Sequence, residues 1–159
     1  MNEHWTRWIH ASLSKYFRDF AKPKGISLFI EAEVKAPEAL KDKVEMRWDG
    51  PYAKQFTRSE WQLNIEINML VTSQVGGTDA HKHKKIVGVV QSMFAPTISV
   101  FKLGNLPDID SEQLLGCLQL RSEDREAIIT SYFGKIGPDV SLEQSTVEAH
   151  YKMSLSTRS

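Results

Sequence analysis

The chain has 159 residues, of which 41% are hydrophobic, and its 20 basic residues balance its 20 acidic ones. This length is typical of one domain and is sufficient to bury a hydrophobic core. The zero net charge argues against a strongly basic nucleic-acid-binding module, and the single Cys excludes a disulfide framework or a cysteine-rich zinc site. No hydrophobic run approaches the roughly 20 residues of a transmembrane helix. We therefore expect a single domain over residues 1–159 and no contact with a membrane.

The first predicted element is an amphipathic helix over residues 2–21. Asn2 is a suitable N-cap, and Pro23 and Gly25 favour an end of the helix just before them. Hydrophobic residues recur at steps of one, three or four and therefore share one stripe. A stripe this aromatic either covers the core or contacts another subunit, and both interpretations stay open. The stripe consists of Trp5, Trp8, Ile9, Leu13, Tyr16, Phe17 and Phe20.

Two strands are predicted next, because hydrophobic and charged residues alternate over residues 26–34 and again over 44–48. The run Asp49-Gly50-Pro51 favours a turn directly after the second strand. The stretch over residues 52–58 has no clear period. We interpret it as a loop or as the arm of a long hairpin.

The strongest strand prediction covers residues 60–71, where six alternate positions from Trp61 to Val71 are hydrophobic. A second amphipathic helix is predicted over residues 79–94, with Thr78 or Asp79 as its N-cap. Strands follow, predicted over residues 98–103, 115–120, 127–133 and 145–155, with a turn between the last two at 134–138.

These elements predict an α+β fold in one domain. Strands in adjacent runs joined by tight turns favour an antiparallel or mixed sheet of about five or six strands. The two amphipathic helices would pack on one face of it. The strands keep a polar face, which should contact water or a polar partner.

The sequence contains no pattern typical of a catalytic, cofactor-binding or metal-binding site. It lacks a glycine-rich phosphate loop and a nucleophile with a base at a recognisable spacing. His81-Lys82-His83 has its two imidazoles on different sides of a helix, so we interpret it as a solvated basic surface or a contact for an acidic partner. Cys117 is expected to be a buried, unreactive thiol.

Three acidic residues, Glu31, Glu33 and Glu45, share the predicted polar face of the sheet. Paired carboxylates can act as an acid and a base when burial raises the pKa of one of them. Strand alternation alone predicts the same residues, so we do not expect an enzyme.

The order of these elements resembles the tail terminator (tail completion) proteins of long-tailed bacteriophages. In that family a Trp-Gln-x-x-x-x-Ile-like strand runs into a polar loop and a helix, and the chain closes on an alternating strand, as it does here over residues 147–155. Residues 35–58 and the acidic loop over 107–112 are longer and more irregular than in the family. The stretch that carries the resemblance is Trp61-Gln62-Leu63-Asn64-Ile65-Glu66-Ile67-Asn68-Met69-Leu70-Val71.

The resemblance implies a structural protein without a catalytic centre or a cofactor. Such proteins form a ring, typically a hexamer, on the end of the tail tube. The ring stops polymerisation of the tube and offers a docking surface to a head-completion or neck protein. Genomic DNA passes through the lumen without specific binding. The implied location is the tail or neck of the virion, after assembly in the host cytoplasm.

On this basis we expect strand edges 60–71 and 145–155 to pair between neighbouring subunits. Lumen-facing acids should keep DNA from adhering. The expected subunit-interface residues are Trp5, Trp8, Trp61 and Tyr151, the lumen-facing acids are Glu31, Glu33 and Glu45, and the residues of the partner-docking loops are Tyr52, Phe56, Arg58, Asp108 and Asp110.

Three alternatives remain open. The chain could be a phage neck (stopper) or tail-tube-like protein. It could be a small cellular binding module with a groove under the aromatic helix. It could also be an acid–base enzyme that uses the three glutamates.

Overall fold

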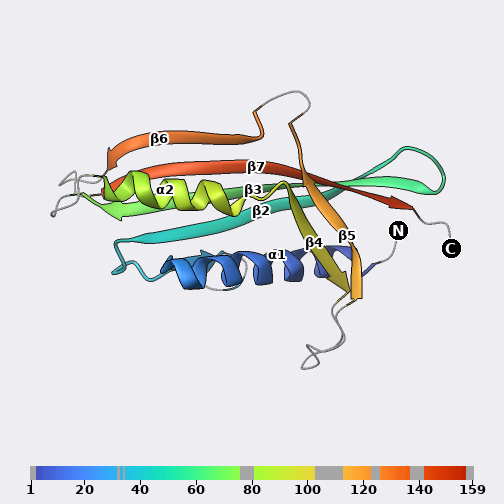
Figure 1. Ribbon diagram of the computed structural model, residues 1–159, viewed down its shortest axis with the longest axis horizontal. Coiled ribbons are helices and arrows are strands. Elements are labelled where there is room, and N and C mark those ends of the chain that lie inside the picture. Colours follow the sequence, from blue (N-terminus) through green and yellow to red (C-terminus); the bar gives the residue numbers. More distant parts are fainter. Residues whose placement is uncertain are drawn as a thin grey trace.

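The computed structural model describes residues 3–31, 33, 35–75, 81–102, 113–122, 126–136 and 142–156. Within these ranges the chain forms two α-helices, one short 3-10 helix and seven strands (Figure 1). In chain order they are α1 (Trp5–Ala21), η1 (Lys22–Lys24), β1 (Leu28–Ile30), β2 (Lys43–Gln55), β3 (Glu60–Gln74), α2 (Lys82–Met93), β4 (Thr97–Lys102), β5 (Gln113–Leu120), β6 (Ile128–Ile136) and β7 (Leu142–Ser156).

All seven strands belong to one mixed sheet of order β1-β2-β3-β7-β5-β4, with β6 also paired to β7. The β1–β2 pair is parallel, and every other pair is antiparallel. The free side of β7 is shared, because β6 pairs with its first half and β5 pairs only near Tyr151 and Lys152. The β4–β5 pair therefore leaves the main sheet and crosses toward α1 (Figure 1). This confirms the predicted α+β class and the mixed sheet.

One hydrophobic core lies between the sheet and the two helices. Alternate residues of β3 from Leu63 to Val71 point into it and are fully or almost fully buried, as the two-residue period of a strand requires. Ile9 and Leu13 of α1 and Val90 of α2 reach the same core. Both helices thus pack their hydrophobic stripes on one face of the sheet, as predicted.

Both helices begin later than predicted. Helix α1 starts at Trp5 and α2 at Lys82, and their N-cap residues, His4 and His81, make no side-chain cap hydrogen bond. The expected caps Asn2, Thr78 and Asp79 lie outside the described residues. The predicted end of α1 is close to the observed one, because Gly25 adopts a left-handed φ of 69° directly after η1.

The strand predicted over 26–34 is much shorter in the structure. It pairs with β2 only from Leu28 to Ile30, and the chain then turns. The backbone N–H of Glu33 donates to the Ile30 carbonyl at 2.9 Å and closes that turn. The alternation of hydrophobic and charged residues therefore extends beyond the strand, which is why the predicted strand was too long.

The turn predicted at Asp49-Gly50-Pro51 is wrong. Strand β2 continues through this run to Gln55, with a bulge that shifts its register against β3 between Asp49 and Tyr52. Gly50 has φ 111°, and a Cβ there would lie 2.7 Å from the Asn64 carbonyl oxygen. The turn occurs at residues 56–59, so the long-hairpin alternative was the better interpretation.

The predicted intersubunit edges, 60–71 and 145–155, are also wrong. Strand β3 lies between β2 and β7, while β7 lies between β3 on one side and β5 and β6 on the other. Both are interior strands, and over most of their length both of their sides are already paired within the protomer. Strand β6 extends past the predicted turn at 134, with a bulge at Gly134 (φ 80°).

Candidate functional site

Helix α1 covers two edges of the sheet with side-chain hydrogen bonds. At β4, the backbone N–H of Phe101 donates to Ser12 Oγ at 2.9 Å. At β2, His10 Nε2 donates to the Gly50 carbonyl at 2.9 Å, and β1 pairs with the start of the same strand. Natural proteins cover or interrupt their edge strands in this way to prevent unwanted pairing.

Among the described residues, no hydrogen bond from another element reaches the backbone of the outer edge of β6, although Gln91 Nε2 of α2 donates to the Thr130 hydroxyl at 2.8 Å. The β6 sequence from Ile128 to Gly134 contains no charge and no Pro. Tyr132 and Phe133 are 60% and 58% exposed, which is unusual for large hydrophobic side chains. An edge strand that is uncharged over residues 128–134 and exposes aromatic rings is a template for pairing with another chain, although the next residue of the strand is the charged Lys135. We call this surface, residues 128–134, the β6 edge.

A second aromatic surface lies on the far part of the β2–β3 hairpin, which extends away from the end of the molecule where α2 begins (Figure 1). Tyr52 and Phe56 are 59% and 58% exposed there. The Lys54 ammonium lies 5.3 Å from the centroid of the Phe56 ring, a cation–π contact. We call residues 51–60 the hairpin arm. It contains three of the expected docking residues, Tyr52, Phe56 and Arg58, although Tyr52 is in a strand; Asp108 and Asp110 lie outside the described residues.

The four expected interface residues serve mainly the core of the protomer. Trp8 and Tyr151 are buried, and the Tyr151 hydroxyl donates to the Ala95 carbonyl at 2.7 Å. Trp5 and Trp61 are half-buried and pack against the same core. Tyr151 and Trp8 are therefore corrected to core residues, because a partner cannot reach them in the folded chain.

Of the three acids predicted to share one face, only Glu31 and Glu45 lie together. Glu31 and Glu45 line a shallow hollow of about 340 Å³ on the polar face of the sheet, together with Arg47 and Asn68. Glu33 turns instead toward α1, and the prediction that it shares that face is wrong.

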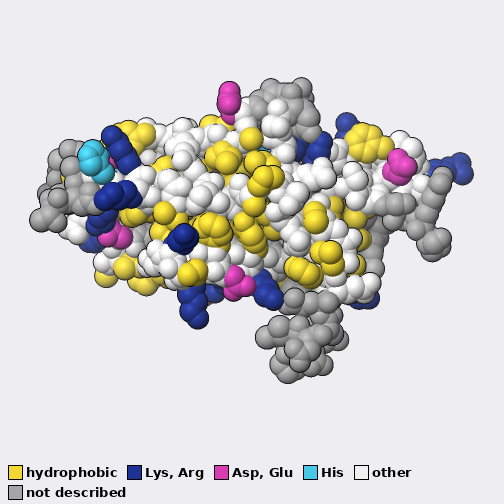
Figure 2. Space-filling view, viewed as in Figure 1, with side chains coloured by type: hydrophobic (Ala, Val, Ile, Leu, Met, Phe, Trp, Pro, Cys, Tyr) yellow, Lys and Arg dark blue, Asp and Glu magenta, His cyan; other side chains and the backbone are white. Residues whose placement is uncertain are grey.

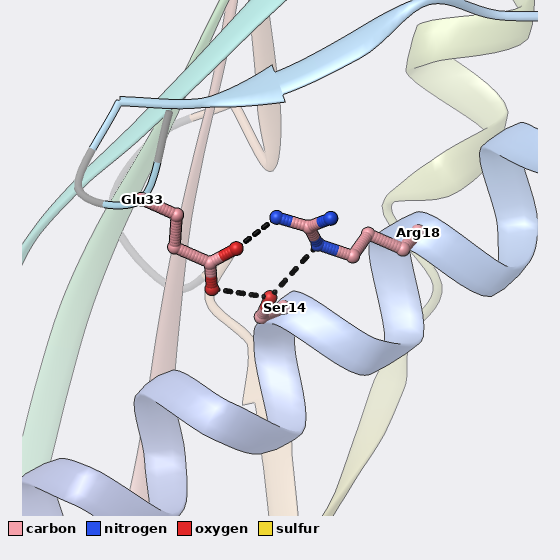
Figure 3. Close-up of polar contacts among 3 residues, drawn as sticks. All are labelled: Ser14, Arg18 and Glu33. Carbon is pink, nitrogen blue, oxygen red and sulfur yellow. Dashed lines mark hydrogen bonds and ion pairs between the residues drawn. The ribbon is translucent and has the colours of Figure 1, made fainter. Parts of the chain in front are cut away.

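Figure 3 shows where Glu33 goes. Its carboxylate accepts a hydrogen bond from Ser14 Oγ at 2.7 Å and forms an ion pair with the Arg18 guanidinium. Arg18 Nε also donates to Ser14 Oγ at 3.2 Å. The turn after β1 causes this, because it places Glu33 beside the helix. The three glutamates therefore do not form one acid–base group.

His83 was predicted to belong to a solvated basic surface, but it is only 5% exposed. Its Nδ1 lies 2.6 Å from Ser73 Oγ on β3, and its Nε2 lies 2.7 Å from Ser145 Oγ on β7. One ring nitrogen of a neutral imidazole donates and the other accepts, and a hydroxyl can take either role. Of the other two residues in that prediction, His81 is exposed, while Lys82 is half-buried and forms an ion pair with Asp42.

A groove of about 600 Å³ lies over this network between α2 and β6. Its lining includes His83 and Ser145, and the Tyr132 hydroxyl donates to Glu143 Oε2 at 3.0 Å at its margin. Burial lowers the pKa of His83, and the negative charge of Glu143 partly opposes this. Both serine hydroxyls are almost completely buried and already bonded to the ring. The network therefore ties α2 to the sheet, and the groove can accept a ligand only above it.

Basic side chains gather at the end of the molecule where α2 begins (Figure 2). Lys82 forms an ion pair with Asp42 at 2.5 Å, while Lys84 and Lys85 are exposed.

The prediction that Cys117 is buried is wrong. Its side chain is exposed, because it lies on the outward side of β5.

One group of metal-ligand type occurs among the described residues: Glu66, Glu148 and His150 on the polar face. None of them was predicted from the sequence to bind a metal ion.

None of the described helices is long and apolar enough to cross a bilayer.

Comparisons with known proteins bear on the fold and not on the function. No family model matches the chain, and no curated protein matches it in sequence. One solved structure, whose name carries no statement of function, is similar with a TM-score of 0.58 and 11% sequence identity. The similarity covers 92% of this chain and 94% of that one. At this identity the similarity shows a shared fold over the covered residues and nothing about function.

Proposed function

We propose that this chain is a self-assembling structural protein of a phage tail, of the tail terminator kind. Its subunits would form a head-to-tail ring, with six copies as the resemblance implies. The ring would sit on the end of the tail tube, stop its growth and bind a head-completion or neck protein. A neck (stopper) or tube-like protein would use the same surfaces. The phage origin, the number of copies and the position in the virion rest on the resemblance alone.

The observation that carries this proposal is the pair of unlike aromatic surfaces on one protomer. The β6 edge exposes Tyr132 and Phe133, and the hairpin arm exposes Tyr52 and Phe56. A head-to-tail ring needs two different patches on each subunit, one for each neighbour. Aromatic side chains are enriched in such interfaces, because they bury much surface at a small entropic cost.

The other edges of the sheet also support this proposal. Helix α1 covers the edge of β4 through Ser12 and the edge of β2 through His10. Both of those hydrogen bonds engage backbone atoms, whereas the hydrogen bond that Gln91 of α2 donates to β6 reaches only the Thr130 side chain. An edge with unpaired backbone groups is the pattern expected where pairing with a neighbour is useful. We propose that the hairpin arm of one subunit lies against the β6 edge of the next.

The acids keep part of their proposed role. Glu31 and Glu45 lie together on the polar face of the sheet and would face the lumen, where negative charge disfavours adhesion of DNA. Glu33 is withdrawn from this set because it is paired with Arg18 on the helix side.

The molar mass in solution tests the proposal. Light scattering after size exclusion should show a multimer of the wild-type chain at high concentration. Phe133→Lys and Phe56→Lys should each reduce it to small species, because each places a charge in one of the two patches. Leu114→Lys is the matched control: Leu114 is 59% exposed on β5, outside both patches, and should leave the mass unchanged. A wild-type chain that stays monomeric, or a control that fails equally, would contradict the proposal.

A second function, a small ligand-binding module, is favoured by one observation. A groove of about 450 Å³ runs beside the aromatic helix, between α1 and β4, and is lined partly by Tyr16, Phe20 and Phe101. Native mass spectrometry of the purified chain tests this alternative. A retained small molecule, lost in Phe20→Lys, would support it over the ring.

A further inference from the structure

Three side chains with metal-binding donors converge on the polar face of the sheet, away from both aromatic surfaces. They are Glu66 of β3 and Glu148 and His150 of β7, and one donor atom from each lies within 4.8 Å of the other two. Glu66 and His150 are direct cross-strand partners, and Glu148 is two residues before His150 on the same face. We propose that these residues bind a divalent first-row transition-metal ion such as Zn²⁺.

The backbone holds these three positions rigidly. Strands β3 and β7 pair without interruption from Glu60 to Gln74, and Glu66 lies near the middle of that ladder. Direct cross-strand neighbours have their Cβ atoms about 4.5–5.5 Å apart. Short side-chain movements therefore bring the donors to the closer spacing that a metal ion requires, without any change in the sheet.

The donor set matches a borderline metal ion. An imidazole nitrogen with two carboxylate oxygens suits Zn²⁺, Mn²⁺, Fe²⁺ or Co²⁺, whereas Ca²⁺ requires six to eight oxygen ligands. Three protein ligands leave one tetrahedral position of Zn²⁺ for water or for a fourth ligand. Asn68 Nδ2 donates to Glu66 Oε1 at 3.3 Å, which orients that carboxylate from outside the group.

Electrostatics also favours a cation at this point. Two carboxylates held this close on one face repel each other, and a positive charge between them removes that repulsion. The side chains of Glu148 and His150 are only 30% and 16% exposed, so water screens the charges less than at an open surface. At present His150 Nε2 donates to Glu148 Oε1 at 2.7 Å, and a metal ion would replace that shared proton.

Positive side chains flank the group, and the backbone N–H of Arg121 donates to the His150 carbonyl at 2.8 Å. Arg121 donates to Asn64 Oδ1 at 2.9 Å, one position along β3 from Glu66 on the same face, and Lys152 pairs with Asn64 across the strands. Arg47 is on β2 beyond Asn68. These charges reduce affinity for a cation, so the site should depend strongly on all three ligands. The inference is independent of the proposed ring, because all three ligands come from one protomer.

Isothermal titration of the untagged full chain with zinc chloride tests the site. We expect one Zn²⁺ per chain and a rise in melting temperature on binding. Glu66→Gln, Glu148→Gln and His150→Gln should each weaken binding at least tenfold, since each removes one ligand. Glu45→Gln is the control, because Glu45 lies on the same face but on β2, and its affinity should stay within twofold of wild type. Co²⁺ bound in place of Zn²⁺ should show a visible absorption band that changes in His150→Gln.

Two results would overturn the inference. The first is a correctly folded wild-type chain, judged by circular dichroism, that shows neither stoichiometric binding nor a change in melting temperature. The second is His150→Gln that binds zinc as tightly as wild type, which would place the ion at one of the other four histidines.

Discussion

The Nε2 atom of His83 lies 2.7 Å from Ser145 Oγ, while its Nδ1 lies 2.6 Å from Ser73 Oγ. A single side chain from the first turn of α2 thus joins the helix to two neighbouring strands. Since the ring and both hydroxyls are buried, each depends on the others for its hydrogen bonds.

Replacing His83 with Leu should destabilise the chain. The substitution keeps an apolar group in the space but leaves two buried hydroxyls without their partner, which costs about 1–3 kcal/mol of unfolding free energy. Urea denaturation followed by circular dichroism measures this. Lys84→Ala, at the exposed neighbouring position, should change stability far less. Equal effects of the two substitutions would show that the network contributes nothing specific.

Stability should fall as the pH drops below about 6.5, and His83 should be one cause. Burial lowers the pKa of His83 in the folded state below its ordinary value of 6.5. Below 6.5 the unfolded chain therefore binds a proton on this residue before the folded chain does, and the unfolding free energy decreases until the folded pKa is reached. Above 6.5 both states are neutral and this effect vanishes. Urea titrations at several pH values should show a shallower acid decline in His83→Leu than in wild type.

Tyr151 should behave as a neutral, hydrogen-bonded core residue. Its burial, and to a smaller extent the nearby Tyr16, raise its pKa well above the ordinary tyrosine value of 10.0. A raised folded pKa means that stability is retained below pH 10 and lost as the pH rises further. Tyr151→Phe should remove this alkaline loss and, by deleting the bond to Ala95, cost about 1 kcal/mol at neutral pH. Alkaline absorbance titration should show one tyrosine of the wild-type chain that ionises only on unfolding.

Gly50→Ala should be costly, and Gly88→Ala should not. At Gly50 the φ of 111° is unfavourable for a side chain, and the new Cβ would lie 2.7 Å from the Asn64 carbonyl oxygen. We expect a loss of about 1–3 kcal/mol. Gly88 is in α2 with no atom within 4 Å of an added Cβ, so alanine there should stabilise by about 0.5–1 kcal/mol. Thermal denaturation of the two variants compares them directly; two effects of the same sign would contradict this account of the bulge.

The sequence predicted the regular elements well where one period dominates. The hydrophobic alternation of β3 faces a single core, as predicted. The strand continues to Gln74, three residues past the predicted end at 71, because residues 72–74 pair with β7. The α+β class followed from the same periods. At Gly50-Pro51 the local turn signal failed, because pairing with β3 on one side and a hydrogen bond from His10 on the other hold the run in a strand.

The surfaces were harder to predict, because they depend on pairing between distant segments. Which strands are interior depends on the order β3-β7-β6, which no local pattern reveals. The residues next to His83 in the sequence are basic and polar. His83 is nevertheless buried, because its ring faces the sheet and bonds to Ser73 of β3 and Ser145 of β7. The lack of a local period predicted a loop or a hairpin arm around Phe56, and Phe56 lies exposed at the hairpin tip. Its docking role follows from the resemblance and stays a prediction.

We propose above that each protomer carries two unlike halves of one interface, the hairpin arm and the β6 edge. Mixing Phe133→Lys with Phe56→Lys tests it most directly, because one chain then keeps an intact hairpin arm and the other an intact β6 edge. Native mass spectrometry should find multimers of the wild type, monomers of each variant alone, and heterodimers that grow no further in the mixture. A mixture that stays monomeric, or single variants that still assemble into full-size multimers, would contradict the account.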